Sequence, residues 1–454
     1  MKTISSILLS FVLILALISP VPVLAEQTEP SPIDRPRISV KVTDNSMTVT
    51  IKKTKNADGF YIYLKESSEA AYRDAGILKE NGSKSRKFTI KNLKAGQYRI
   101  KIRAYSGTDL SKYSKSKSFK IEEGSALSLW NDEAPLKNEL INYLKIITDE
   151  SSSDYIPVEN RIAVFDLDGT LFCETDPNYF DYTLLVYRVL EDPDYKDKAT
   201  DFEKETAEKI VTLNQTGVAA KGLEVDHGKA VASAFSGMTP DEFISYIQEF
   251  KKLPMPSYDG MNRGDGWYRP MLQVVELLKA NGFTVYIVSG TDRFIVRGIA
   301  YNSPLELPMG QLIGSDETLV ASNQNGVNGL EYVFTDKDSV ILGGEFIIKN
   351  LKMNKVTVIA QEIGVQPVLS FGNSTGDSSM AKYTTSNNPY KSLAFMLCCD
   401  DLERENGNTE KAEKMFKLCN ESDWIPVSMK DDWKTIYGDG VTKKQTDKIL
   451  EEAA

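Results

Sequence analysis

The sequence has little of two residue types on which many active sites depend. Its 454 residues include one histidine, His227, and four cysteines. A Ser-His-Asp triad would have to use His227, which we interpret as an ordinary polar residue of its domain and not as a substrate contact. No zinc-type spacing relates the cysteines, so we expect either buried apolar side chains or one bridge to Cys419, the four being Cys173, Cys398, Cys399 and Cys419.

An excess of positive charge is also absent. Lys and Arg number 54 against 64 Asp and Glu, which gives a net charge of -10. Such a chain has no general attraction to nucleic acid or to anionic membranes, so we expect no nucleic-acid partner. An anionic ligand would need a local positive site.

The first 36 residues predict an export signal and a linker. Met1-Lys2 precedes an apolar stretch from Ile4 to Ile18, and the run Ser19-Pro20-Val21-Pro22-Val23-Leu24-Ala25 follows before a polar sequence. This pattern is typical of a signal peptide (1–25) and predicts a secreted, extracellular protein. A retained membrane anchor is the alternative, although the stretch is short for a span of about 20 residues. Residues 26–36, rich in Pro, Ser, Thr and Glu, predict a flexible linker.

Residues 37–122 alternate apolar and polar side chains in short segments. Turn-forming Asn, Gly, Asp and Lys separate these segments, a pattern that predicts an all-β, immunoglobulin-like sandwich. The run from Leu93 through Tyr98 to Tyr105 resembles the late corner and strand of a fibronectin type III domain, although the Trp usual in an early strand of that family is absent. The resemblance implies a spacer, or a contact with a cell-wall or extracellular polymer.

Residues 126–445 show a different pattern, in which amphipathic helices alternate with short apolar runs. Helices are predicted at 136–147 and 271–280, and strands at 162–165, 285–288 and 368–371. This order predicts an α/β domain with a mostly parallel, Rossmann-like sheet, where ligands bind at the carboxyl ends of the strands.

Two carboxylates, Asp166 and Asp168, directly follow the first of these strands. The next residues, Gly169-Thr170, let the chain turn sharply. Carboxylates two residues apart repel each other unless they share a cation or a proton. A lone D-x-D can be a surface turn or a calcium loop, but the apolar residues on both sides favour the edge of an active site.

The run Asp166-Leu167-Asp168-Gly169-Thr170 resembles the first motif of the haloacid dehalogenase-like superfamily, in its phosphoserine-phosphatase-like branch. The resemblance implies that Asp166 attacks phosphorus and forms an aspartyl-phosphate. Asp168 would protonate the leaving alkoxide and then activate water. A carboxylate is a weak nucleophile, so it needs a metal and positive charge to approach a phosphate dianion.

The same resemblance assigns a phosphate-binding hydroxyl and a lysine. Ser289, at the end of the run Val285–Thr291, would bond a phosphoryl oxygen together with Gly290. Lys355 fits the lysine that neutralises nucleophile and phosphate, with Lys349 and Lys352 as nearby alternatives.

The fourth motif reads Gly372-Asn373-Ser374-Thr375-Gly376-Asp377 and departs from the family, which often has Asp at the position of Asn373. An amide oxygen can still ligate Mg²⁺, but the site loses one negative charge. We expect Asp166, the Asp168 carbonyl and Asn373 around Mg²⁺, with Asp377 ligating through water or orienting Lys355.

Residues 173 to about 265 separate the first two motifs by more than a connection needs. This insertion resembles a helical cap that closes over the active site and selects the leaving group. Trp267-Tyr268, which follow it, are interpreted as hinge packing.

Together these features predict an exported, Mg²⁺-dependent phosphomonoester hydrolase, a phosphatase acting on a small phosphorylated metabolite. A dehalogenase would not need the acid at Asp168, and a phosphate-transfer pump would carry Thr there. A phosphonate-cleaving relative that uses a lysine of the cap stays open. The alternative is a secreted binding or adhesion protein whose phosphatase-like domain is degenerate, for which Asn373 is the only support.

Overall fold

The computed structural model describes residues 33–43, 46–90, 93, 95–121 and 127–444. The chain divides into two compact units, Met1–Gly124 and Ser125–Ala454. The predicted signal peptide and most of the predicted linker lie outside the described residues. No helix in the described ranges is long and apolar enough to cross a membrane.

The first unit is an antiparallel β-sandwich. Alternate residues of its strands face inward, as Tyr98, Ile100 and Ile102 do, and Tyr98 stacks on Phe119 with ring centroids 5.5 Å apart. One sheet contains β1 (Ile38–Thr43), β2 (Ser46–Lys52) and β5 (Ser85–Ile90); the other contains β3 (Gly59–Glu66), β4 (Arg73–Lys79), β6 (Gly96–Ser106), β7 (Asp109–Leu110) and β8 (Lys117–Ile121). The predicted sandwich is confirmed.

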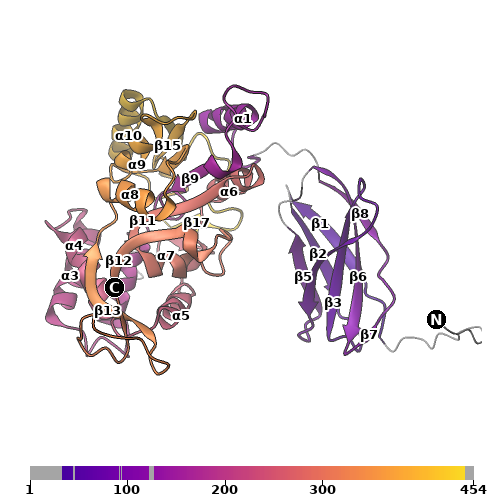
Figure 1. Cartoon of the computed structure of the whole chain (residues 1–454), viewed down its shortest axis with the longest axis horizontal. Coiled ribbons are helices and arrows are strands. Elements are labelled where there is room, and N and C mark those ends of the chain that lie inside the picture. The colour runs from indigo at the N-terminus through magenta and orange to yellow at the C-terminus, as the bar shows by residue number, and fades with distance from the viewer. Residues whose placement is uncertain (1–32, 44–45, 91–92, 94, 122–126, 445–454) are drawn as a thin grey trace, which may run out of the picture. The chain divides into compact units, whose positions relative to one another are not determined.

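The second unit is built on a seven-stranded sheet, and Figure 1 labels several of its strands. Its strands run in the order β13 (Val340–Ile348), β12 (Leu312–Ala321), β11 (Thr284–Asp292), β9 (Ile162–Phe165), β14 (Leu369–Gly372), β15 (Leu393–Cys398) and β16 (Ile425–Ser428). All neighbours pair in parallel except β12 and β13. The central strand β9 is buried along its whole length. The predicted α/β class is therefore confirmed.

Helices cover this sheet because each has one apolar face. In α6, Pro270 lies in the first turn, Val274 and Leu278 are buried, and Gly282, with φ +79°, follows the helix end. The helices of the core are α1 (Pro135–Ile147), α6 (Arg269–Ala280), α7 (Arg293–Ala300), α8 (Met353–Val358), α9 (Ser378–Thr385) and α10 (Thr409–Ser422). A small sheet, β10 (Tyr258–Asp259) with β17 (Thr442–Lys443), completes the unit.

Four helices inserted between β9 and β11 form the cap: α2 (Phe180–Val186), α3 (Asp201–Thr216), α4 (Leu223–Ala234) and α5 (Pro240–Phe250). Helix α5 starts with a full capping box, in which the Thr239 and Glu242 side chains each bond the other's backbone N–H. A second capping box, Thr200 with Glu203, starts α3.

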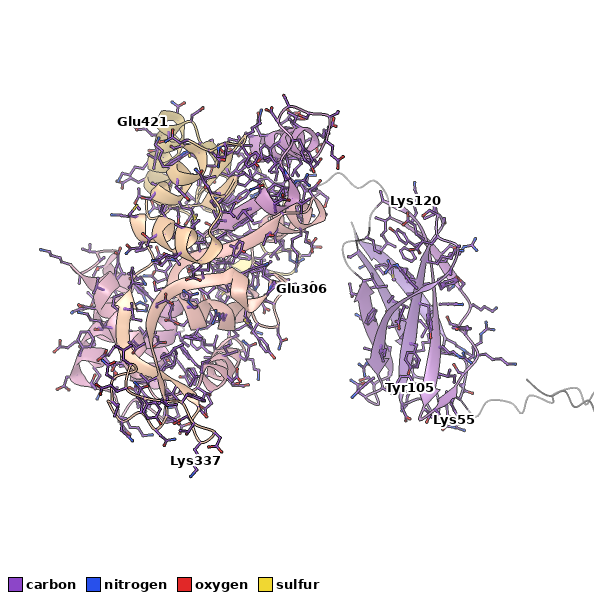
Figure 2. All side chains as sticks on the ribbon, viewed as in Figure 1. Lys55, Tyr105, Lys120, Glu306, Lys337 and Glu421 are labelled. Atoms are coloured by element: carbon purple, nitrogen blue, oxygen red, sulfur yellow. The ribbon has the colours of Figure 1, made fainter. Side chains whose placement is uncertain are left out.

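The cap also rests on a β-ribbon that the sequence did not predict. This ribbon is the antiparallel pair β12–β13. The Gly237 N–H donates to the Leu342 carbonyl at 2.9 Å, and the Leu342 N–H donates to the Met238 carbonyl at 2.8 Å. Figure 2 places Lys337, in the connection between the two strands, and Glu421, near the end of α10, at opposite ends of the unit. The cap is thus a helical insertion braced by a second, later segment.

All four cysteines are buried and free. Cys398 and Cys419 belong to one apolar cluster with Trp424. The expectation of buried side chains holds, and the alternative of a bridge to Cys419 is wrong.

Candidate active site

The motif residues meet at the carboxyl edge of the three central strands. Phe165, the last residue of β9, pairs with Ile287 of β11 and with Phe371 of β14. The next N–H, that of Asp166, donates to the Phe371 carbonyl at 2.9 Å. Because the three strands are parallel, the residues that follow them lie at the same edge.

The loop after β9 is a tight turn. The Leu167 carbonyl accepts the N–H groups of Thr170, Leu171 and Phe172. Gly169 has φ +76°, and a Cβ there would lie 2.0 Å from Asn373 Nδ2. A side chain at this position would be strained and would displace Asn373, so the glycine is required.

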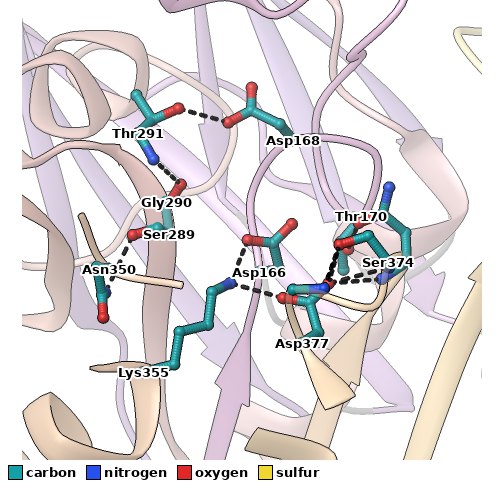
Figure 3. A network of polar contacts seen from close by, with 12 residues as sticks. Asp166, Asp168, Thr170, Ser289, Gly290, Thr291, Asn350, Lys355, Ser374 and Asp377 are labelled. Carbon is teal, nitrogen blue, oxygen red and sulfur yellow. Dashed lines mark hydrogen bonds and ion pairs between the residues drawn. The ribbon is translucent and has the colours of Figure 1, made fainter. Parts of the chain in front are cut away.

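Lys355, on the first turn of α8, lies between two carboxylates (Figure 3). Its Nζ is 2.6 Å from Asp166 Oδ1 and 2.6 Å from Asp377 Oδ1, and the side chain is fully buried. Burial lowers the pKa of Lys355, but the charges of Asp166 and Asp377 overcome this and raise it. Lys349 is half-buried and Lys352 exposed. Of the three candidate lysines, Lys355 is the one whose ammonium contacts Asp166.

Asp377 supports this lysine and the loop after β14. Its Oδ2 accepts the Asn373 N–H at 3.1 Å, the Ser374 N–H at 3.0 Å and the Ser374 hydroxyl at 3.1 Å. With Oδ1 bonded to Lys355, both oxygens are engaged. Of the two roles predicted for Asp377, the structure shows the orientation of Lys355.

Asp168 is held by a hydroxyl that it shares with the cap. Thr291 Oγ1 donates to Asp168 Oδ2 at 2.8 Å and lies 3.3 Å from Oδ2 of Asp181, on α2. Burial, the Asp181 charge and the Asp166 charge raise the pKa of Asp168 well above its ordinary value. A carboxyl that keeps its proton near neutral pH suits a general acid.

Asp166, the predicted nucleophile, would have to be ionised to attack phosphorus, and its surroundings oppose the ionised state. Burial and the Asp377 charge raise the pKa of Asp166, against the lowering effect of Lys355. A cation at the second oxygen would favour the ionised form.

The remaining donors at this edge fit Mg²⁺. Asp166 Oδ2, the Asp168 carbonyl and Asn373 Oδ1 are hard oxygen donors of the kind that Mg²⁺ prefers. Asn373 Oδ1 accepts only a long hydrogen bond, from the Thr170 hydroxyl at 3.5 Å. Within the described ranges, no group of three His, Cys, Asp or Glu residues is placed to hold a metal. A Mg²⁺ ion at this edge would therefore have a mixed ligand set, with one carboxylate, one amide and one backbone carbonyl.

Ser289 is positioned by its neighbours on β11. Its Oγ accepts the Thr291 N–H at 3.0 Å, and its carbonyl accepts from Asn350 Nδ2 at 3.0 Å. The Ser315 hydroxyl donates to the Gly290 carbonyl at 2.6 Å. These bonds fix the backbone at the two residues that we expect to contact phosphate.

His227 lies in the cap and is almost fully buried. Its Nε2 is 3.2 Å from the Asp181 carbonyl, and its ring centroid is 4.3 Å from that of Tyr182. Burial lowers the pKa of His227 to about 4. The imidazole is therefore neutral near pH 7 and packs within the cap.

Trp267 and Tyr268 are buried after the insertion. The Trp267 ring packs edge-on against Phe172, with ring centroids 5.1 Å apart, and both residues agree with hinge packing.

A cavity of about 810 Å³ lies beside the site. Its wall includes Glu174, Tyr179 and Tyr182, the segment from Leu213 to Val225 of the cap, and Lys411 of α10. The Glu174 charge and burial raise the pKa of Tyr179, with smaller contributions from Asp168 and Asp166. The cavity thus adjoins the motif residues through Glu174, which lines it and accepts a hydrogen bond from Asn373 Nδ2.

Sequence reasoning missed three residues: Glu174, Asp181 and Thr291. Thr291 was within reach, because it ends the run that contains Ser289. Glu174 and Asp181 have no sequence spacing that relates them to the motifs.

The second unit is an α/β domain with a helical cap. Residues 163–382 match the model of the haloacid dehalogenase-like hydrolase family. The second unit therefore contains a haloacid dehalogenase-like hydrolase domain. A search of curated proteins finds no significant match.

Similar solved structures have low identity to this chain. A conserved protein of unknown function from Anaerococcus prevotii DSM 20548 is 14% identical, covering 65% of this chain and 94% of its own, with a TM-score of 0.41. Cytosolic 5'-nucleotidase IIIB bound to cytidine is 11% identical, covering 68% and 92%, with a TM-score of 0.40. A mutant of FN3tt is 20% identical, covering 20% of this chain and 98% of its own, with a TM-score of 0.18.

Proposed function

We propose that this chain is a Mg²⁺-dependent phosphomonoester hydrolase whose nucleophile is Asp166. The observation that carries the proposal is the contact between Asp166 and the buried ammonium of Lys355, at the end of the central strand. Burying a lysine between two carboxylates has a desolvation cost. We attribute this arrangement to the binding of a further anion, and a phosphate dianion is such an anion.

The residues have separate tasks in this reaction. Asp166 attacks phosphorus, the ester P–O bond breaks, and Asp168 gives its proton to the leaving alkoxide. Asp168, now ionised, takes a proton from water as the water attacks the aspartyl-phosphate, which releases phosphate and restores Asp166. Ser289, the Gly290 backbone and Lys355 hold the phosphoryl oxygens. Bound Mg²⁺ would supply further positive charge at the phosphate.

The cap supplies the space for the leaving group. The cavity beside Tyr179 and Tyr182 is large enough for a small metabolite, and its wall comes from both cap and core. We propose that substrate choice is made there.

The test is phosphate release from a panel of phosphomonoesters by residues 26–454. We expect turnover with Mg²⁺, loss of turnover with chelator and loss in Asp166→Asn. Activity that survives the substitution would remove the mechanism. A protein that is inactive on every phosphomonoester would favour the alternative, a secreted binding protein whose phosphatase-like domain is degenerate.

We propose export separately, on the evidence of the apolar N-terminal stretch and of Ala25, which directly precedes a polar sequence. The first unit would then act as a spacer outside the cell or contact a wall polymer. Mass spectrometry of the protein from the culture medium should find an N-terminus at Glu26. A chain that stays in the membrane fraction with its first residues intact would show an anchor instead.

A further inference from the structure

Asn373 is the one position where the predicted metal site lacks an expected charge. Its side-chain amide has an oxygen, Oδ1, and a nitrogen, Nδ2, and only Oδ1 can ligate a cation. Asn373 Nδ2 donates to Glu174 Oε2 at 2.9 Å. A carboxylate accepts hydrogen bonds and does not donate them, so this contact fixes the amide with Oδ1 directed elsewhere, on the side of Thr170.

Glu174 is built into the active-site turn. It is 6% exposed, and a Cβ on Gly169 would lie 2.7 Å from its Cδ and Oε2. Its other oxygen, Oε1, forms an ion pair with Lys411. The carboxylate thus touches the amide of the metal-site residue and the loop between Asp166 and Thr170.

The two residues fit each other by charge. An aspartate at position 373 would place a second carboxylate oxygen about where the amide nitrogen now lies, and the two anions would repel each other. An amide avoids this repulsion. Its hydrogen bond to Glu174 also draws electron density toward Oδ1, which makes this oxygen a better ligand.

We propose that Glu174 replaces the negative charge missing at Asn373 and positions the Asn373 amide as a ligand for Mg²⁺. The inference rests on the magnesium site of the proposed function. Outer carboxylates that orient metal ligands typically contribute about 10- to 100-fold in metal affinity. Glu174 acts through Asn373 and is a positioning residue.

The test is Mg²⁺ binding to residues 26–454, measured by titration calorimetry without substrate. We expect Glu174→Gln to weaken Mg²⁺ binding about 10-fold or more. The exchange Asn373→Asp with Glu174→Gln should return the affinity to within about threefold of the parent, because the two changes are coupled. Additive losses in the double variant would overturn the inference.

Two controls separate this role from simpler ones. Glu203→Gln changes a buried glutamate that bonds Tyr195, Thr200 and Ser233 of the cap, and it should leave Mg²⁺ affinity at the parent value. Lys411→Met breaks the ion pair but keeps the Glu174 charge, and should not weaken Mg²⁺ binding. If Glu174 served only its ion pair, Glu174→Gln would lower thermal stability as Lys411→Met does and leave Mg²⁺ affinity unchanged.

Mg²⁺ binding by the parent protein shows whether a failure concerns the role of Glu174 alone or the magnesium site as a whole. Parent protein that binds Mg²⁺, together with a Glu174→Gln variant that binds it equally well, overturns this inference alone. Parent protein that binds no Mg²⁺ at millimolar concentration overturns the magnesium site as well.

Discussion

Lys355 Nζ lies 2.6 Å from Oδ1 of Asp166 and 2.6 Å from Oδ1 of Asp377, so one buried ammonium joins the proposed nucleophile to the loop after β14. Lys355→Met would leave two buried carboxylates without a counter-charge. We expect kcat/KM to fall by about 10²-fold or more and stability to fall by about 3–5 kcal/mol. Steady-state kinetics and urea unfolding measure the two effects.

Lys352→Met is the matched control, because Lys352 is exposed three residues earlier. It should change both quantities little. A Lys355→Met variant that unfolds at the parent urea concentration and turns over at the parent rate would show that the two ion pairs contribute neither to stability nor to catalysis.

Thr291 gives a test of the general acid. Its hydroxyl donates to Asp168 at 2.8 Å, so Thr291→Val should leave the Asp168 carboxyl poorly oriented. Hydrolysis of an alkyl phosphate, whose leaving group needs a proton, should fall by about 10-fold or more, and hydrolysis of p-nitrophenyl phosphate much less. Kinetics on the two substrates give the ratio. Thr206→Val, at a buried cap threonine, is the control, and equal losses on both substrates would contradict the role of Thr291.

Glu317, on β12, should make the stability of the second unit depend on pH. It is 6% exposed, neither carboxylate oxygen has a hydrogen-bond partner among the described residues, and burial together with Asp292 and Asp316 raises its pKa to about 9. Below its unfolded-state pKa near 4.5, both states hold the proton. As pH rises toward 9 the unfolded state ionises first, so stability is lost.

Glu317→Gln should therefore stabilise the second unit at pH 8 by about 1 kcal/mol or more and change it less at pH 5. Tryptophan fluorescence during urea unfolding reports this unit alone, because all four tryptophans lie in it, at 130, 267, 424 and 433. Glu345→Gln, at an exposed glutamate of β13, should show no difference between the two pH values. An equal effect of Glu317→Gln at both pH values would contradict the raised pKa.

The sequence predicted the elements whose periodicity is strong. The central strands and helices α1 and α6 were found because long apolar faces are buried against one sheet. Strand β4 has no marked alternation in the sequence, because its residues are exposed or half-buried. The β12–β13 ribbon was missed because its strands pair across a polar connection that resembles an ordinary loop.

The site was predictable to the extent that its residues follow strands. Asp166, Ser289 and Asn373 meet because parallel strands end at one edge. Glu174 could not be found in this way, since it contacts a residue 199 positions away and a single glutamate after a turn has no marked pattern. Asp181 belongs to a helix of the cap, and its approach to Asp168 depends on how the cap packs.

The central claim is that Asp166 carries the phosphoryl group during turnover, and trapping the intermediate tests it most directly. Parent enzyme is mixed with a phosphomonoester and Mg²⁺, quenched during turnover and reduced with borohydride, which converts an acyl phosphate to the alcohol. Peptide mass spectrometry should then find homoserine at position 166 and unchanged aspartate at position 168. Reduction at Asp168, or steady turnover with no modified residue, would contradict the account.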